Sequence, residues 1–396
     1  MAEENKKLKV TIDDITIEVD PGTTVLEAAR MIGGDVVPPA MCYYGKLEGS
    51  GGKCRTCLVE IAQSSAQNPR GMPKLQVSCR TGVMDGMVVK NITSPKVMEA
   101  RKGVVELLLI NHPLDCPICD QAGECDLQDL SYQHGVDGTR YEFMRRTFDP
   151  IDIGDKIKLH MKRCILCYRC VYVAQQLTPE RVHGIIDRGD EAQISTYIHH
   201  AIDNDFSGNM IDVCPVGALT DKTARFKNRV WFLKPMDAHR DCDHPGCSGK
   251  VALWMRGKEV FRVTARKNEW GEVESFICNT CRYDKKDPED WVIEGPRKIN
   301  RHSVISQGHY VGTTKPKEVM PEVMGGRKPR LLMNIHEVSQ VNMPDVDLSA
   351  IKGPATSEVF NKAAENMPAW KKEHRLIGDG AEIEKQPAGD DERHKQ

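Results

Sequence analysis

The sequence contains no apolar run that approaches the roughly 18 residues needed by a membrane-spanning helix, so we predict no direct membrane span. Its formal net charge of −2 offers no overall positive charge to attract nucleic acid. A phosphate-binding GxGxxG motif after a strand is also lacking, as is any recognisable pairing of a nucleophile with a base. These absences argue against a nucleic-acid-binding protein and against a self-contained enzyme, and we predict no catalytic residue.

Cysteine, in contrast, is abundant, with fifteen residues in a chain of 396. An odd number cannot pair completely into disulfides, whereas groups of four ligands suit metal ions and iron–sulfur clusters. The cysteines form four groups, which we call the first to the fourth set: Cys42, Cys54, Cys57 and Cys79; Cys116, Cys119 and Cys125; Cys164, Cys167, Cys170 and Cys214; and Cys242, Cys247, Cys278 and Cys281. The second set is one ligand short, and His112 stands just upstream of it.

The first set has the layout of a plant-type [2Fe-2S] loop, with a longer gap than usual between its first two cysteines. Gly49, Gly51 and Gly52 precede Cys54. Glycine lets the backbone approach a cluster so closely that N–H groups reach the sulfur atoms. We therefore predict a [2Fe-2S] cluster at this set, with a structural zinc site as the alternative.

The third set begins with three cysteines at CxxCxxC spacing and ends, far downstream, with Cys214 followed by Pro215. This is the bacterial ferredoxin pattern divided into two parts. Because only one CxxCxxC run is present, we predict one [4Fe-4S] cluster here and not two. Zinc rarely uses three cysteines at such tight spacing, which favours the cluster.

His112 is the residue that could complete the second set, which would then have the spacing His-x3-Cys-x2-Cys-x5-Cys. A lone histidine is more often a surface or core residue than a ligand, so the spacing alone leaves the two roles equally open. A neutral imidazole in place of a thiolate would make a cluster less negative and favour its reduction, as histidine ligands do in Rieske centres.

The fourth set places two cysteine pairs on either side of a predicted hairpin, whose strands cover Val251–Trp254 and Val260–Val263. A hairpin between two cysteine pairs is also how zinc ribbons are built. His239 and His244 lie close enough in the sequence to replace one of the thiols. The spacing therefore leaves zinc and [4Fe-4S] both open.

Hydrophobic alternation predicts a hairpin near the start of the chain, with strands at Leu8–Ile12 and Ile15–Val19. Thr24 and Glu27 then form a capping-box pattern, which opens a helix that Gly33 closes. A hairpin, a helix and a cysteine-bearing loop together predict a small α+β domain.

A second helix is predicted to begin at Ser94-Pro95, a serine cap followed by a proline in the first turn, and to end near His112. From about Ile299 onward the sequence is polar and lacks sustained periodicity. We expect one modest helix there, at Ser357–Lys371, in a tail that binds a partner or is partly disordered.

Stretches around these ligands resemble one known family. They read NHPLDCPICDQAGECDLQD at 111–129, RCILCYRC at 163–170 and CPVGAL at 214–219. These stretches resemble the signatures of the G subunit of NADH-quinone oxidoreductase, respiratory complex I, and residues 39–57 resemble its ferredoxin-like loop. The likeness covers about residues 8–235 and is specific, because three independent ligand sets occur in the family's order.

The resemblance implies an α+β multidomain fold. Residues 1–95 would form a β-grasp [2Fe-2S] ferredoxin domain, 96–150 a helical [4Fe-4S] domain with one histidine and three cysteine ligands, and 151–235 a ferredoxin-like [4Fe-4S] domain. Residues 236–300 would be a small strand-rich, metal-binding remnant of a molybdopterin-oxidoreductase-like domain, and 301–396 an extended tail. The resemblance also implies that His112 is the fourth ligand of the second set, which would then hold a [4Fe-4S] cluster.

The family's role implies that this chain relays single electrons within the peripheral arm of complex I. Electrons would arrive from the FMN- and NADH-binding subunit at the first set and pass to the third set and then to the second. They would leave for the subunit with two ferredoxin-type [4Fe-4S] clusters, near the quinone-arm subunits. The start of the chain has neither a secretory apolar core nor a transit character. We therefore expect a peripheral location on the cytoplasmic side of a bacterial inner membrane.

Two features depart from the family. The gap between Cys42 and Cys54 is one residue longer than usual, which enlarges a loop and leaves the predicted cluster unchanged. This chain is too short to hold the large domain that normally follows, and the fourth set does not reproduce the CxxCxxxC…C pattern with which some bacterial members bind an additional [4Fe-4S] cluster. Cys278 falls where the last ligand of that pattern would lie, and Cys281 is extra. The resemblance favours [4Fe-4S] only slightly at this site off the electron path, and zinc remains open.

Two other functions remain as alternatives. The electron-transfer subunit of an NAD-linked hydrogenase or formate dehydrogenase shares the first two sets, but such proteins generally keep two complete CxxCxxC motifs where this chain keeps one. A multi-zinc scaffold or nucleic-acid module would carry a basic face and be colourless, and the charge balance argues against it.

Overall fold

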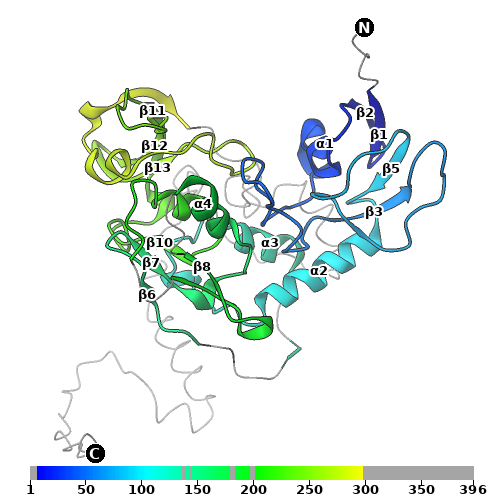
Figure 1. Ribbon diagram of the computed structural model, residues 1–396, viewed down its shortest axis with the longest axis horizontal. Coiled ribbons are helices and arrows are strands. Elements are labelled where there is room, and N and C mark those ends of the chain that lie inside the picture. The colour runs from blue at the N-terminus through cyan, green and yellow to red at the C-terminus, as the bar shows by residue number, and fades with distance from the viewer. Residues whose placement is uncertain are drawn as a thin grey trace, which may run out of the picture. The chain divides into compact units, whose positions relative to one another are not determined.

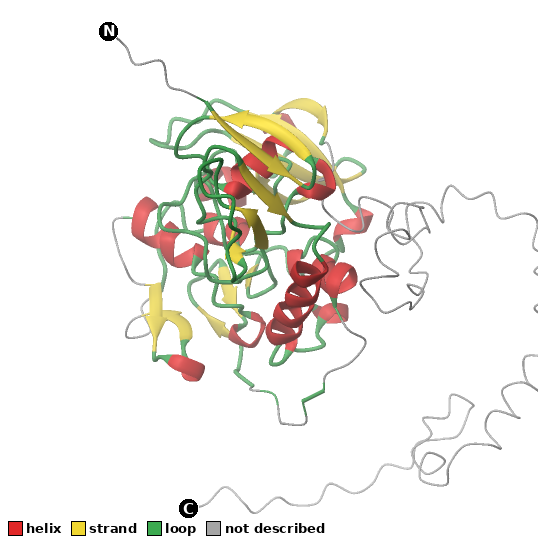
Figure 2. Ribbon diagram, turned by 90° about the vertical axis from the view of Figure 1, so that its right-hand side faces the viewer, coloured by secondary structure: helices red, strands yellow, loops and turns green. Residues whose placement is uncertain are grey.

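The computed structural model describes residues 7–135, 140–141, 145, 147–178, 183–196 and 201–297 (Figure 1). The predicted tail at 301–396, with its helix at Ser357–Lys371, lies outside the described residues. Helices and strands are joined by long loops (Figure 2). Most of the cysteines of the four sets lie in such loops. None of the described helices is long and apolar enough to cross a membrane. The structure is mixed α and β, and the five domain boundaries stay a prediction.

The described chain begins with a five-stranded sheet in the order β2-β1-β5-β3-β4. Its strands are β1 (Leu8–Ile12), β2 (Ile15–Val19), β3 (Leu58–Gln63), β4 (Gln76–Val77) and β5 (Met87–Lys90). The predicted hairpin is confirmed, because β1 and β2 pair antiparallel and the chain turns through Asp13 and Asp14, both in the left-handed region. β1 also pairs parallel to β5, so the sheet is mixed.

The predicted capping box is confirmed at the start of α1 (Val25–Ile32). Thr24 Oγ1 accepts a hydrogen bond from the Glu27 N–H at 3.2 Å, and the Glu27 carboxylate accepts one from the Thr24 N–H at 2.9 Å. Gly33 follows the helix with φ 78°, a left-handed value that suits glycine. The apolar side of α1 is buried in the core beside the sheet.

The second helix, α2 (Pro95–Leu109), begins at the predicted serine cap but ends three residues before His112. Its buried face carries Arg101, whose guanidinium donates to the carbonyl oxygens of Thr56 and Leu58 at 3.0 and 3.2 Å. These bonds hold α2 against the start of β3, next to the loop that carries the first set.

The middle of the chain contains two small sheets, one three-stranded in the order β10-β7-β6 and one formed by β8 and β9. The elements are η2 (Cys116–Ile118), α3 (Asp126–His134), β6 (Ile151–Asp152), β7 (Ile157–Leu159), α4 (Arg169–Leu177), β8 (His183–Ile186), β9 (Gln193–Thr196), α5 (Asn209–Val213) and β10 (Leu219–Asp221). Helices α4 and α5 pack together. This packing brings Cys170, on α4, close to Cys214, which follows α5.

The last described region is a four-stranded antiparallel sheet in the order β13-β12-β11-β14. Its strands are β11 (Lys234–His239), β12 (Lys250–Arg256), β13 (Glu259–Ala265) and β14 (Val292–Pro296). The predicted hairpin is confirmed as β12 and β13, joined by a tight turn at Gly257-Lys258. After β13 a single π-helical turn, η7 (Thr280–Asp284), carries Cys281.

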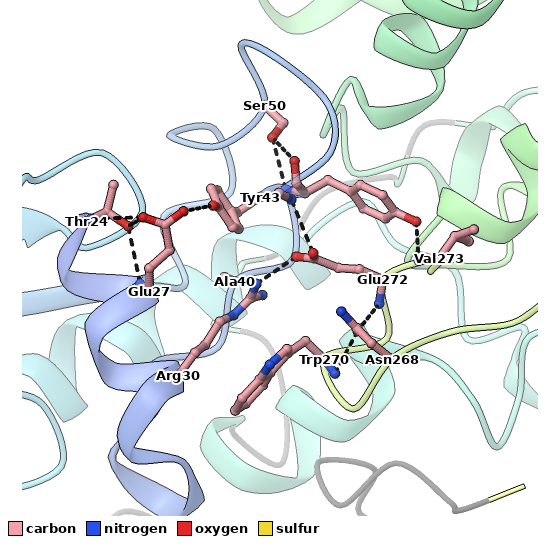
Figure 3. Close-up of polar contacts among 12 residues, drawn as sticks. Thr24, Glu27, Arg30, Ala40, Tyr43, Ser50, Asn268, Trp270, Glu272 and Val273 are labelled. Atoms are coloured by element: carbon pink, nitrogen blue, oxygen red, sulfur yellow. Dashed lines mark hydrogen bonds and ion pairs between the residues drawn. The ribbon is translucent and has the colours of Figure 1, made fainter. Parts of the chain in front are cut away.

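A buried ion pair joins α1 to the loop after β13 (Figure 3). Arg30 Nη1 lies 2.8 Å from Glu272 Oε1, and the N–H of Gly45 donates to Glu272 Oε2 at 3.2 Å. Beside this pair, the phenol oxygen of Tyr44 accepts a hydrogen bond from the N–H of Val273. The loop that carries the first ligand, Cys42, is therefore bonded directly to the segment that leads to Cys278.

Candidate metal and iron–sulfur sites

The four thiols of the first set are buried and fall into two pairs. The Sγ atoms of Cys57 and Cys79 are 3.5 Å apart, and the side chains of Cys42 and Cys54 are hydrogen-bonded to each other. Two thiolates on one tetrahedral metal atom stand about 3.8 Å apart when each metal–sulfur bond is about 2.3 Å long. The set therefore fits two metal atoms with one cysteine pair on each, which suits a [2Fe-2S] cluster.

Backbone N–H groups surround the sulfur atoms of the first set. The N–H of Gly52 donates to Cys79 Sγ at 3.2 Å, and those of Lys53 and Cys54 donate to Cys42 Sγ at 3.2 and 3.3 Å. The hydrogen bond from the Cys54 thiol, helped by these N–H groups, lowers the pKa of Cys42 to about 5 against the opposing effect of burial. The glycine-rich loop thus brings the backbone onto the sulfur atoms, as its sequence predicts.

The third set lines a cavity that also takes in apolar side chains of β7 and β10. Burial raises the pKa of each of its four thiols above the ordinary value. Thiols in such surroundings give up their protons only when a positive charge joins them, which bound iron atoms would provide. A sulfur-lined cavity of this kind fits a [4Fe-4S] cluster.

An N–H group and a histidine ring reach the thiols of the third set. The N–H of Leu166 donates to Cys164 Sγ at 3.3 Å, and His183 Nε2 lies 3.2 Å from Cys170 Sγ. Burial lowers the pKa of His183 to about 4, so its ring is neutral near pH 7 and one of its nitrogens carries a proton. His183 was not predicted from the sequence, because it lies on β8, outside every cysteine motif.

The residues of the second set lie at the ends of helices. His112 follows α2, Cys116 and Cys119 lie at η2, and Cys125 is the residue that caps α3. Burial lowers the pKa of His112 to about 4, with Arg163 contributing, so the imidazole is neutral near pH 7 and able to bind a metal. Its Nδ1 is buried without a hydrogen-bond partner. A neutral imidazole with a free nitrogen has the chemistry of a metal ligand, so His112 stays the predicted fourth ligand of this set.

Gly217 lies where the second and third sets meet. It belongs to the run that begins at the third-set ligand Cys214, and a Cβ built on it would stand 2.1 Å from Cys119 Sγ. Only glycine leaves room for that sulfur atom. Nearby, the N–H of Asp126 donates to the carbonyl oxygen of Pro215 at 3.2 Å. The segments that carry the second and third sets are therefore in direct contact.

Arg169 connects the third set to the first. It immediately precedes the ligand Cys170, and its Nη2 donates to the carbonyl oxygens of Ala40 and Tyr43 at 3.1 and 2.7 Å. These two carbonyls lie on either side of Cys42 in the sequence. The segments that carry the third set thus contact the loop of the first set through Arg169 and the ligand Cys119 of the second set through Gly217. Arg169 lies within the motif at 163–170, but the motif alone indicates no role for it.

The fourth set also comes together in space. Cys242 and Cys247 lie in the loop between β11 and β12, whereas Cys278 and Cys281 lie at the start of η7. The four sulfur atoms all lie within 4.8 Å of one another. The structure therefore gathers the four thiols that the sequence grouped, at one end of the last sheet.

Three family profiles match the chain in the order of its ligand sets. Residues 5–94 match a 2Fe-2S iron-sulfur cluster binding domain, and residues 101–140 match the NADH-ubiquinone oxidoreductase-G iron-sulfur binding region. Residues 154–220 match the ferredoxin-like domain of NADH-quinone oxidoreductase subunit 3. The first three sets fall within these matches and the fourth set lies outside them.

Individual proteins show the same relationship. The NADH-ubiquinone oxidoreductase 75 kDa subunit of Reclinomonas americana is 41% identical over 276 residues, which are 70% of this chain and 38% of that protein. The G subunit of the NADH-quinone oxidoreductase of Rickettsia bellii is 42% identical over 262 residues, which are 66% of this chain and 36% of that protein.

A solved structure of an NAD+-reducing [NiFe]-hydrogenase in the H2-reduced state contains a chain that is 28% identical, with a TM-score of 0.48. That likeness covers 56% of this chain and 91% of the hydrogenase chain. The present chain spans less than two fifths of the length of the two curated relatives described above. On the three matched regions and these identities, the chain belongs to the family of the NADH-quinone oxidoreductase G subunit.

Proposed function

We propose that this chain is an electron-transfer subunit of an NADH-quinone oxidoreductase, respiratory complex I, and relays single electrons from the NADH-oxidising subunit toward quinone. The observation that carries the proposal is that the segments holding the third ligand set contact those of both other sets, through Arg169 and Gly217. One-electron relay requires clusters that lie close to one another, and these contacts support such an arrangement. Family membership over the region that holds all three sets supports the same role.

We assign one cluster to each of the first three sets. The assignment is a [2Fe-2S] cluster on Cys42, Cys54, Cys57 and Cys79, a [4Fe-4S] cluster on Cys164, Cys167, Cys170 and Cys214, and a [4Fe-4S] cluster on His112, Cys116, Cys119 and Cys125. When bound, such clusters supply reversible one-electron redox chemistry. The chain contributes no catalytic residue of its own in this proposal.

The protein's part is to hold the ligands and to set the electrostatic surroundings of each set. N–H groups of Lys53 and Leu166 point their positive ends at the sulfur atoms of Cys42 and Cys164, which stabilises added negative charge. The neutral His112 replaces a thiolate and leaves the second set less negative by one charge. These differences give the sets different affinities for an electron.

The proposed partners follow from the same role. They are the FMN- and NADH-binding subunit, the subunit with two ferredoxin-type [4Fe-4S] clusters, and the quinone-arm subunits. We propose that the chain reaches a peripheral position on the cytoplasmic side of a bacterial inner membrane through these partners. The names of the curated relatives support membership in such a complex.

The variant Cys164→Ala in the assembled complex tests the proposal. It removes one ligand of the third set, which the proposed route places between the other two, so NADH-to-quinone electron flow should be lost. NADH oxidation with ferricyanide, an acceptor that can take electrons before they reach this chain, should persist and shows that the complex is assembled. Quinone reduction that continues while electron paramagnetic resonance shows this cluster to be absent would contradict the proposed role.

A further inference from the structure

The fourth set has the geometry of a single tetrahedral metal ion, and we propose that it binds one zinc ion in place of an iron–sulfur cluster. The Sγ atoms of Cys242 and Cys278 are 3.8 Å apart, as are those of Cys247 and Cys281. Four thiolates around one zinc, each bonded at about 2.3 Å, stand about 3.8 Å from one another. The observed separations match this value.

A [4Fe-4S] cluster needs a wider arrangement of thiols. Its cysteine sulfurs stand roughly 6 Å apart, because four irons and four sulfides lie between them. All four sulfurs of the fourth set lie within 4.8 Å of one another, and within the described part of the chain no other group of ligand atoms converges in this way. The four thiols of the third set, all among the described residues, do not converge in this way and line a cavity instead. The chain thus contains one compact group of four thiols, the fourth set, and one wider group, the third set.

The surroundings of the fourth set also hold the thiols where they are. Cys278 and Cys281 are fully buried within the apolar core, so they cannot separate without opening it. The N–H of Cys278 donates to Cys247 Sγ at 3.3 Å, and the N–H of Cys281 donates to Cys278 Sγ at 3.4 Å. Such N–H donors offset the negative charge that four thiolates leave on one divalent ion.

The two nearby histidines are engaged elsewhere and do not complete the site. His239 Nδ1 lies 2.8 Å from a carboxylate oxygen of Glu294. His244 uses both ring nitrogens, with Nε2 3.0 Å from Asp205 Oδ2 and Nδ1 3.2 Å from the Pro245 carbonyl oxygen. The donor set is therefore four thiols, a closed set that is typical of structural zinc.

The segment that carries two of these ligands packs against α5, which leads to the third set. The carbonyl oxygen of Ile277 accepts a hydrogen bond from Asn209 Nδ2 at 2.8 Å, and the N–H of Ile277 donates one to Asn209 Oδ1 at 3.1 Å. Arg282, next to Cys281, forms a fully buried ion pair with Asp212, two residues before Cys214. Because zinc has no redox chemistry, its role here is to hold this segment in place and not to carry electrons.

Metal analysis and zinc X-ray absorption of the purified holoprotein, from cells supplied with both iron and zinc, test the inference. We expect about one zinc per chain, with four sulfur neighbours at about 2.3 Å and no iron neighbour. Cys242→Ser changes a partly exposed ligand and should remove the zinc while leaving the iron and sulfide content unchanged. His244→Gln, in the same loop, is the matched control and should keep the zinc.

Iron in place of zinc at this site, or a loss of about four irons in Cys242→Ser, would overturn the inference, as would a holoprotein without zinc. If Cys242→Ser fails to fold, the absorption spectrum of the unaltered protein still decides the question. The result is separate from the proposed electron transfer, because a zinc ion at the fourth set requires none of the three clusters to be active.

Discussion

The guanidinium of Arg163 donates two hydrogen bonds to one carboxylate oxygen of Asp115, at 3.0 and 2.8 Å. Arg163 immediately precedes the third-set ligand Cys164, and Asp115 immediately precedes the second-set ligand Cys116. Partial burial would raise the pKa of Asp115, but Arg163 and Lys162 outweigh it and lower that pKa. The pair is therefore charged near pH 7 and joins two ligand sets through their flanking residues.

Replacing Asp115 by asparagine should destabilise the holoprotein by roughly 2–3 kcal/mol, because Arg163, only 3% exposed, would keep its charge without a carboxylate beside it. Urea unfolding followed by the visible absorbance of the clusters measures the loss. Asp152→Asn is the matched control, since its carboxylate is 49% exposed where it meets Lys158 and Lys222, and its removal should cost less than about 1 kcal/mol. Equal losses in the two variants would contradict the importance of the buried pair.

Gly217→Ala should remove the cluster of the second set, because the added Cβ would stand 2.1 Å from Cys119 Sγ and displace that ligand. Iron and acid-labile sulfide should each fall by about four per chain. Gly103→Ala is the control, since a Cβ there meets no atom within 4 Å and lies within α2, where alanine favours the helix. A Gly217→Ala protein with unchanged iron and sulfide would show that the sulfur does not lie against this glycine.

His112→Cys should still assemble a cluster at the second set, but with a lower reduction potential, because a thiolate adds a negative charge that the neutral imidazole does not carry. A redox titration followed by electron paramagnetic resonance measures the potential. The potential of the first set, recorded in the same titration, serves as the internal control. If the second-set potential does not move, His112 is not a ligand.

Stability should decline as the pH is lowered, in part through His134. Burial, with Arg101 nearby, lowers the pKa of His134 to about 3 from its usual 6.5. At pH values between these two pKa values, the unfolded chain binds a proton that the folded chain does not. Through this residue, the free energy of unfolding should therefore fall by about 1.4 kcal/mol as the pH is lowered from 8 to 5.5. His134→Gln cannot titrate, and its unfolding free energy should therefore decline by that much less over the same range. Parallel declines in the two proteins would contradict a buried, neutral His134.

Local elements could be predicted from the sequence because their signals lie within a few residues of one another. The β1–β2 hairpin, the capping box of Thr24 and Glu27 and the β12–β13 hairpin form where their patterns place them. The predicted end of α2 near His112 is also confirmed, with the last helical residue at Leu109. His112 precedes a proline, which disfavours helical backbone at that residue.

The geometry within and between the ligand sets could not be predicted. The spacing of the cysteines in the sequence assigns them to four sets. It does not give the distance between their sulfur atoms, which is what distinguishes a zinc site from a cluster site. Arg169 reaches carbonyl groups more than a hundred residues away, and His183 meets Cys170 from another strand. Arg101 lies on the apolar side of α2, where its guanidinium donates hydrogen bonds to backbone carbonyl groups. Those carbonyl groups come close to Arg101 only when the chain is folded, so its burial could not be predicted.

The proposed electron relay depends above all on three iron–sulfur clusters, one on each of the first three ligand sets. Iron and acid-labile sulfide analysis of the purified holoprotein, with electron paramagnetic resonance of a reduced sample, tests their presence most directly. We predict about ten irons and about ten sulfides per chain, with signals from one [2Fe-2S] and two [4Fe-4S] clusters. A protein that contains zinc at these sets, without iron and sulfide, would contradict the proposal.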